Sequence, residues 1–202
     1  LKRNGIEVTG RIGTMERFRH VAQANRESPG IVVRSHLEYI RAGAQVITTN
    51  TYACVPSAFD DDTSVVVDLI RAGGECAQEA RAIARDEGLA SADSILIAGS
   101  LPPLHETYQV DRVADYDELS AGYRMIVDAV SPYSDVLLCE TMHSSREAYA
   151  AAEAANAAGI PVWVSFTVSD DDLGTLRSGE SMAEGLEALS DFGNVEAVLV
   201  NC

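Results

Sequence analysis

Five nearly continuous apolar runs divide this sequence at regular intervals, and they constrain its fold more than any other feature. The runs are rich in Val, Ile and Leu, and they span 45–52, 94–100, 135–141, 161–168 and 197–202. Parallel strands are buried on both faces, so they read as continuous apolar runs rather than as alternating ones. The sequence therefore predicts five strands of a parallel sheet.

Helical patterns fill the intervals between these runs. Segments near 29–42, 64–87, 116–130, 145–158 and 181–191 carry apolar residues at spacings of three and four. Ser28 is placed as an N-cap before Pro29, and Thr63 is a candidate cap of the second helix. The pair Gly73-Gly74 inside that helix opposes it by about 2 kcal/mol of helix propensity. Strands that alternate with helices predict βαβ units, so we expect an α/β fold.

Two architectures can be built from five such units. A flavodoxin-like doubly wound sheet is complete with five strands, whereas a closed (β/α)8 barrel needs eight. The strands recur about every 39 residues, so eight units would need more than the 202 residues present. The chain also begins without Met and ends on a strand-like run. We therefore expect one domain over 1–202, which is incomplete if it is a barrel.

The charge of the chain excludes several classes of partner. Asp and Glu number 31 against 15 Lys and Arg, which gives a formal charge of −16 at pH 7, and such a surface repels nucleic-acid phosphates and anionic lipid. No apolar run approaches the roughly 20 residues of a membrane span, and no export signal opens the chain. The cysteines lie far apart, as is typical of free thiols. We expect no nucleic-acid or membrane partner and a cytoplasmic protein.

In both architectures, active groups gather at the carboxyl ends of the parallel strands. Asn50 and Thr51 belong to a polar cluster that ends the first run, and they suit either a ligand carboxylate or neighbouring backbone. Glu140 ends the third run, where a carboxylate is either functional or half of a structural ion pair. Cys202 ends the fifth run as either a buried apolar group or a soft metal ligand. Further candidates in strand-end loops are His105 and His143.

The connection that follows the second run is unusually long. It extends over 101–115, whereas βα loops typically have about 2–6 residues. Such a loop is either a lid or wall over a site, or a spacer.

Six segments, taken in order, resemble successive blocks of the homocysteine S-methyltransferase family. They span 36–52, 98–105, 135–142, 162–167, 176–180 and 198–202. The resemblance implies a partial (β/α)8 TIM barrel with strands two to six present. It also implies a zinc-dependent enzyme that transfers a methyl group from a donor to the sulfur of homocysteine, giving methionine. The methyl donor is not indicated, and association into a homo-oligomer is left open.

The resemblance also assigns residues. Cys202 matches the first zinc ligand of the family, Glu140 matches the acidic residue that holds the substrate ammonium group, and Asn50 and Thr51 fall in a block that lines the same pocket. The family's other two zinc cysteines and its amino-terminal Asp-Gly-Gly block have no match in this sequence, so we expect the 202 residues alone to be inactive. Two alternatives are a non-catalytic amino-acid-binding module and a complete flavodoxin-like domain.

Overall fold

A computed structural model describes residues 1–6, 9, 14–89, 94–105, 108–172 and 174–201. The chain divides into two compact units. The first unit comprises 1–100 and 129–135, and the second comprises 101–128 and 136–202. Each unit has helices packed on parallel strands, and the expectation of one domain over 1–202 stays a prediction.

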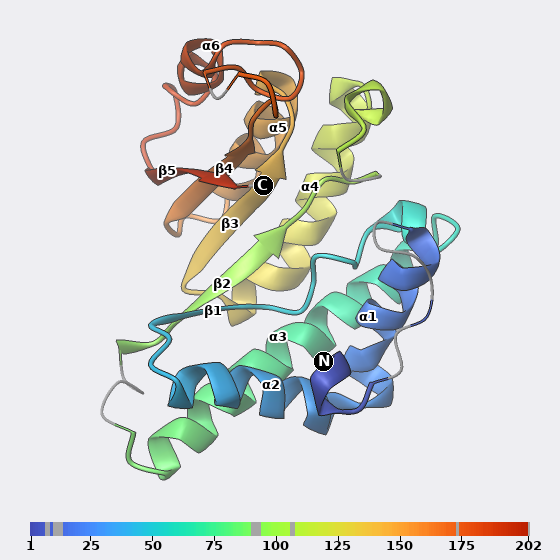
Figure 1. Ribbon diagram of the computed structural model, residues 1–202, viewed down its shortest axis with the longest axis vertical. Coiled ribbons are helices and arrows are strands. Elements are labelled where there is room, and N and C mark those ends of the chain that lie inside the picture. The colour runs from blue at the N-terminus through green and yellow to red at the C-terminus, as the bar shows by residue number, and fades with distance from the viewer. Residues whose placement is uncertain (7–8, 10–13, 90–93, 106–107, 173, 202) are drawn as a thin grey trace. The chain divides into compact units, whose positions relative to one another are not determined.

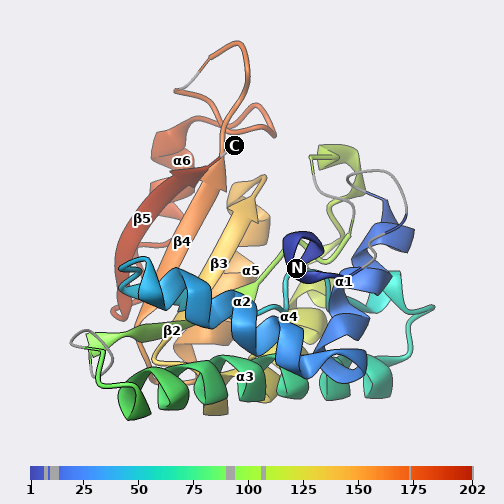
Figure 2. The same cartoon turned by 60° about the horizontal axis from the view of Figure 1, so that its bottom comes forward.

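The first unit is built mainly from long helices. Its helices and strands are α1 (Met15–Glu27), α2 (Pro29–Arg41), β1 (Val46–Thr48), α3 (Thr63–Asp86) and β2 (Leu96–Leu101). The short 3-10 turns η1 (Lys2–Asn4), η2 (Pro56–Ala58) and η5 (Ser131–Tyr133) accompany them. Strands β1 and β2 pair in parallel, with Val46 opposite Leu96. Helices α2 and α3 lie side by side, as Figures 1 and 2 show.

The apolar faces of these helices form the core of the first unit. Successive turns of α2 and α3 and the centres of both strands supply buried side chains, among them Val33, Leu37, Ile40, Ile47, Ala77, Ala80 and Ile97. Helix α1 was not predicted, because its mean hydropathy is low and its pattern is polar. Helix α3 begins one residue earlier than expected, and the expected Thr63 cap is wrong. Asp62 is the N-cap, and its carboxylate accepts from the backbone N–H groups of Ser64 and Val65.

The second unit is a three-stranded parallel sheet with its connecting helices. Its elements are η4 (Val110–Arg112), α4 (Tyr116–Val130), β3 (Val136–Met142), α5 (Ser145–Asn156), β4 (Val162–Thr167), α6 (Met182–Glu187) and β5 (Val195–Asn201). Strand β4 pairs with β3 on one side and with β5 on the other. Figure 2 shows the three strands running side by side with their carboxyl ends at one edge.

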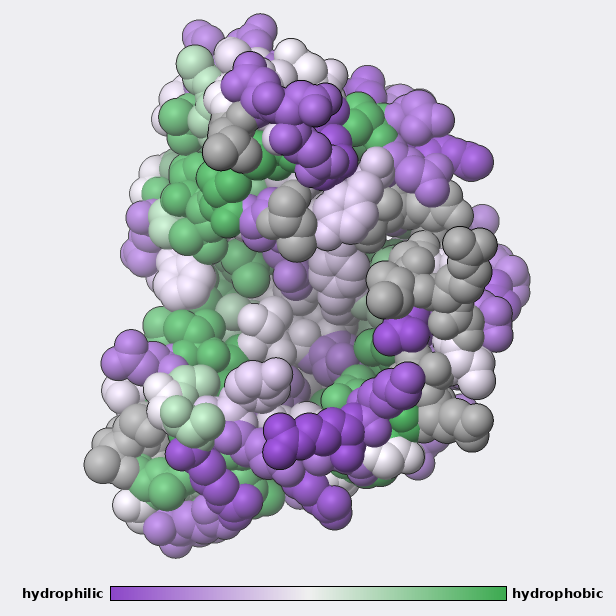
Figure 3. Space-filling model, viewed as in Figure 1, coloured by the Kyte–Doolittle hydropathy of each residue, from purple (hydrophilic) through white to green (hydrophobic). Residues whose placement is uncertain are grey.

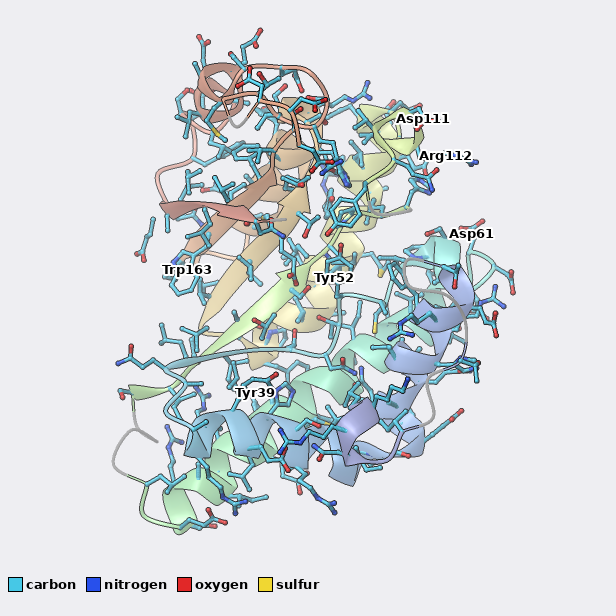
Figure 4. The ribbon with its side chains drawn as sticks, in the orientation of Figure 1. Tyr39, Tyr52, Asp61, Asp111, Arg112 and Trp163 are labelled. Atoms are coloured by element: carbon cyan, nitrogen blue, oxygen red, sulfur yellow. The ribbon has the colours of Figure 1, made fainter. Side chains whose placement is uncertain are left out.

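Helix α5 covers β3 and β4. Its inward residues are almost all alanines, which let the helix approach the sheet closely. Cys139 and Val164, which are paired across β3 and β4, are fully buried. The preceding pair, Leu138 and Trp163, points to the opposite face of the two strands and is only half-buried. Trp163 is labelled on β4 in Figure 4.

The strand order is β1-β2-β3-β4-β5, and β1 with β2, β3 with β4, and β4 with β5 all pair in parallel. Each strand is therefore next to its neighbours in sequence, as in consecutive βα units of a barrel. The doubly wound alternative is wrong, because its order reverses after the first pair. The predicted α/β fold is confirmed, although β1 is shorter than the expected 45–52. Within the described ranges, no helix is both long and apolar enough to cross a membrane.

Strand β5 exposes an apolar surface. Val198, Leu199 and Val200 are 39%, 39% and 58% exposed, and Figure 3 shows hydrophobic surface where β5 lies in Figure 1. Three successive exposed apolar residues at the end of a sheet form a surface that proteins usually cover.

The two adjacent glycines of α3 are explained by close packing. A Cβ atom on Gly73 would lie 2.7 Å from Nδ2 of Asn25, and one on Gly74 would lie 2.5 Å from Cγ of the Tyr133 ring. Both distances are shorter than carbon atoms tolerate. The two glycines lower the helix propensity of α3, but they allow α1 and η5 to approach it closely.

We predict that Gly74→Ala lowers the free energy of unfolding by about 1–3 kcal/mol, because the added methyl group overlaps the Tyr133 ring. Urea denaturation followed by circular dichroism measures this change. Gly30→Ala in α2 is the matched control, since nothing lies within 4 Å of its Cβ position, and it should be neutral or stabilising. Equal effects of the two substitutions would contradict the packing explanation.

His36 borders a cavity of about 350 Å³ between α2 and β1. Its Nε2 atom is buried and has no hydrogen-bond partner within the described part of the chain, and burial lowers the pKa of the imidazole to about 4. Tyr39, labelled in Figure 4, lines the same cavity from α2. The cavity is thus bordered by an imidazole that folding keeps neutral.

The depressed pKa makes stability depend on pH. The unfolded chain binds the His36 proton near pH 6.5 and the folded chain near pH 4. The contribution of His36 to the free energy of unfolding is therefore complete above pH 6.5 and is lost as the pH falls toward 4. We expect a loss of about 3 kcal/mol, since each pKa unit is worth about 1.4 kcal/mol. His36→Leu should remove that part of the pH dependence. Identical pH profiles of unfolding free energy for the two proteins would contradict this account.

Candidate functional site

Strand β3 is irregular at its carboxyl end. Cys139 pairs with Val164 and Met142 pairs with Phe166, so three residues of β3 advance while β4 advances two. Thr141 in this bulge has φ +63°, a conformation that is a clear outlier for a β-branched residue. Glu140, immediately before it, is half-buried. The bulge therefore changes the direction of the backbone at Glu140, the carboxylate that the sequence analysis predicted as a site residue.

A chain of hydrogen bonds joins the carboxyl ends of the three strands. Ser165 Oγ of β4 donates to Asn201 Oδ1 of β5 at 2.8 Å, and Asn201 Nδ2 donates to Thr141 Oγ1 of β3 at 3.0 Å. Ser165 and Thr141 are buried. The neighbouring strand β5 thus holds the strained Thr141 in place. Backbone strain that neighbouring structure maintains in this way is typical of functional sites.

His143 and Glu147 form a buried pair just beyond β3. Glu147 Oε2 accepts from the backbone N–H of His143 at 2.8 Å and from His143 Nδ1 at 3.0 Å, and the two side chains are 2% and 1% exposed. His143 Nε2 accepts from the backbone N–H of Tyr108 at 2.8 Å. The imidazole is therefore the neutral tautomer with its proton on Nδ1. This pair fixes Tyr108, in the long connection after β2, beside the end of β3.

Glu180 fastens the loop after β4 to the start of α5. Its carboxylate accepts from the backbone N–H and the hydroxyl of Ser145 and from the hydroxyl of Ser178. Burial opposes ionisation, but these hydrogen bonds lower the pKa of Glu180 below its ordinary value. The loop that carries Arg177 and Ser178 is therefore held against the same strand ends as Glu140.

Asn50 and Thr51 lie in the first unit, just after β1. Asn50 Nδ2 donates to Val21 O at 3.0 Å and to Asn25 Oδ1 at 2.8 Å, while Asn25 Nδ2 donates to Asn50 O at 2.8 Å. Thr51 is 1% exposed, and its hydroxyl shares a hydrogen bond of 2.8 Å with that of Thr49. Their polar atoms bond to neighbouring protein groups, which is one of the two outcomes that the sequence left open.

The described cysteines are ordinary buried thiols. Burial raises the pKa of Cys76 to about 11 and raises those of Cys54 and Cys139 further, so all three stay protonated at neutral pH. No group of three or more His, Cys, Asp or Glu side chains that could hold a metal occurs among the described residues. The predicted metal ligand, Cys202, lies outside them.

The other histidine candidate, His105, pairs with a carboxylate of α4. His105 Nε2 contacts Glu118 Oε1 at 2.7 Å in an exposed pair. Glu147, Tyr108 and Arg177 were not predicted as site residues. The spacing Ser144-x-x-Glu147 was a signal for Glu147, because it is the pattern of a helix N-cap and its third residue.

Proteins of known activity resemble this chain over most of its length. The homocysteine S-methyltransferase of Escherichia coli (strain K12) is 30% identical over 187 residues, which cover 87% of this chain and 59% of the relative. Homocysteine S-methyltransferase 1 of Arabidopsis thaliana is 29% identical, with the same two coverages. A betaine-homocysteine S-methyltransferase of Drosophila melanogaster is 29% identical and covers 80% of this chain. The chain thus spans about three fifths of the length of the first two relatives.

Structure and family comparisons agree with these relatives. The metallated form of the homocysteine methyltransferase MmuM from Escherichia coli superposes with a TM-score of 0.85 at 27% identity, covering 100% of this chain and 70% of that chain. The model of the family named homocysteine S-methyltransferase matches residues 7–202. The predicted partial barrel is therefore confirmed, and the chain belongs to the homocysteine S-methyltransferase family.

Proposed function

We propose that the protein transfers a methyl group to the sulfur of homocysteine, giving methionine, in a zinc-dependent reaction. The observation that carries this proposal is the position of Glu140 in a family member: a half-buried carboxylate at a bulge on the carboxyl edge of a parallel sheet. Active groups of such folds lie at this edge. Membership of the family supports the proposed substrate class, and the local geometry supports the choice of Glu140.

Glu140 holds the ammonium group of homocysteine in this proposal. A carboxylate that leaves a buried strand has lost part of its hydration, so a cationic partner compensates it well. Binding the charged amine fixes one end of a short, flexible amino acid. The thiol at the other end is then presented in one direction, which lowers the entropy cost of the displacement.

The bulge is the device that orients Glu140. Regular pleating sends alternate side chains to opposite faces of a sheet, and one extra residue changes that alternation. Thr141 takes up the change in an αL conformation, at an expected cost of about 1–3 kcal/mol. The hydrogen bond from Asn201 holds Thr141 in that conformation. We therefore assign Asn201 and Thr141 positioning roles.

Cys202 is proposed as one ligand of the zinc. It follows Asn201, whose partner in β4 is Thr167, at the carboxyl ends of their strands. Thiolate ligands favour zinc over harder cations. Bound by such ligands, zinc would hold a coordinated substrate thiol in its nucleophilic thiolate form.

Asn50 and Thr51 are proposed to line the substrate pocket from the loop after β1. Their hydrogen bonds to Asn25, Val21 and Thr49 hold the loop in one shape. Side chains that are engaged in this way define the shape of a pocket and add no charge to it.

In the reaction itself, the substrate thiol releases its proton to solvent and the sulfur attacks the donor's methyl carbon. The bond from that carbon to its carrier breaks, and its electron pair leaves with the carrier.

We predict that Glu140→Gln in the full-length protein weakens homocysteine binding by about 10- to 100-fold, because a hydrogen bond between charged groups is worth about 1.5–3 kcal/mol. Isothermal titration calorimetry with homocysteine measures this change. The same experiment with 4-mercaptobutyrate, which lacks the amine, should show no difference between Glu140→Gln and the unaltered protein.

The matched control is Glu196→Gln, which removes an exposed carboxylate from the amino-terminal part of β5. It should leave homocysteine affinity within about twofold, since an exposed charge distant from the ligand is screened by solvent. Homocysteine affinity that is the same in Glu140→Gln and Glu196→Gln would overturn the ammonium role of Glu140.

A further inference from the structure

Arg177 differs from the other cations of the second unit. The second unit has 95 residues, which include four arginines and no lysine. Three of these arginines, Arg112, Arg124 and Arg146, are exposed. Arg112, for example, extends from η4 in Figure 4. The Arg177 side chain is only 21% exposed. In a chain with a formal charge of −16, a partly buried guanidinium needs an explanation.

Backbone hydrogen bonds place Arg177 at the carboxyl edge of the sheet. Its N–H donates to Thr167 O, the last residue of β4, at 3.1 Å, and the next N–H, of Ser178, donates to His143 O at 3.0 Å. Glu140 lies three residues before His143. Because β3 and β4 are adjacent and parallel, Arg177 and Glu140 belong to the same edge of the same three-stranded sheet.

The guanidinium group is held in a fixed plane. Its Cζ atom lies 5.1 Å from the centroid of the Tyr108 ring, in a cation–π contact. The Tyr108 backbone is in turn fixed by His143 and Glu147. Tyr108 has φ +68° and is 46% exposed, a conformation that bulky residues rarely adopt. The loop thus accepts backbone strain to bring this ring beside Arg177.

The donors of Arg177 are incompletely used. Nη1 and Nη2 donate to the two carboxylate oxygens of Asp170 at 3.4 and 3.0 Å, while Nε is buried and has no hydrogen-bond partner within the described ranges. A guanidinium group has five N–H donors. Asp170 is 79% exposed, and an ion pair whose carboxylate is solvated in this way contributes little to stability. Another carboxylate can therefore replace that of Asp170, and the Asp170 pair shows that Arg177 binds this chemical group.

We infer that Arg177 binds the carboxylate of the amino-acid substrate, which displaces Asp170 from the guanidinium group. This inference rests on the proposed function, in which Glu140 binds the ammonium group. An α-amino acid carries both charges on neighbouring atoms, so one acidic and one basic side chain at the same edge recognise it at two points. Planar guanidinium groups bind carboxylates through two parallel hydrogen bonds.

The test compares two ligands and three proteins by isothermal titration calorimetry. The ligands are homocysteine and 3-aminopropane-1-thiol, which keeps the amine and thiol but lacks the carboxylate. The full-length protein with its metal bound should prefer homocysteine by about 10- to 100-fold. Arg177→Met should lose most of that preference by weakening homocysteine alone, and the exposed Arg146→Met should retain it. Equal weakening of both ligands by Arg177→Met would show a merely structural role and overturn the inference.

Asp170→Asn provides a second, independent test. It keeps the size of the side chain and removes the charge that competes for Arg177, so homocysteine should bind more tightly by about two- to fivefold, with no change for 3-aminopropane-1-thiol. Unchanged or weaker homocysteine binding overturns the inference even if Arg177→Met fails to fold. If the unaltered protein binds neither ligand, the proposed function fails, whereas equal binding of both ligands leaves that function intact and excludes carboxylate recognition by Arg177.

Discussion

The parallel pairing of β3, β4 and β5 is the constraint on which the site depends. It brings residues that are far apart in sequence, such as Thr141, Ser165 and Asn201, to one edge, where their side chains form a continuous hydrogen-bonded chain. The bulge in β3 then breaks the regular alternation at Glu140. Without adjacent strands to hold it, the strained backbone at Thr141 would relax, and the carboxylate would lose its orientation.

Hydrogen bonds to carboxylates fasten the loops to that edge. Glu147 holds His143, which holds the backbone of Tyr108, and Glu180 holds the loop that contains Arg177. Glu147 is buried and Glu180 is half-buried, and each accepts from a backbone N–H group as well as from a side chain, which replaces part of its lost hydration. These contacts preorganise the described part of the edge, which reduces the entropy cost of recognition.

Much of this arrangement follows from local sequence patterns, and the rest depends on tertiary packing. The apolar runs predict β2 to β5 and the parallel sheet, and strand-end position singles out Glu140. Helix α1 is polar in pattern and packs against α3, and periodicity does not reveal such a tertiary contact. The glycines at 73 and 74 appear unfavourable until the neighbours that they admit are known. Arg177 and Tyr108 are 69 residues apart in sequence and meet through loop packing, which no local pattern encodes.

The central claim is that the carboxyl edge of this sheet holds homocysteine by its charged groups, with the ammonium group on Glu140. A crystal structure of the full-length, metal-loaded protein with homocysteine tests it most directly. We expect the substrate nitrogen within about 3 Å of a Glu140 carboxylate oxygen, with the sulfur directed toward the metal-bound thiolate of Cys202. A homocysteine molecule bound at this edge with its nitrogen turned away from Glu140, or bound at another edge of the sheet, would contradict it.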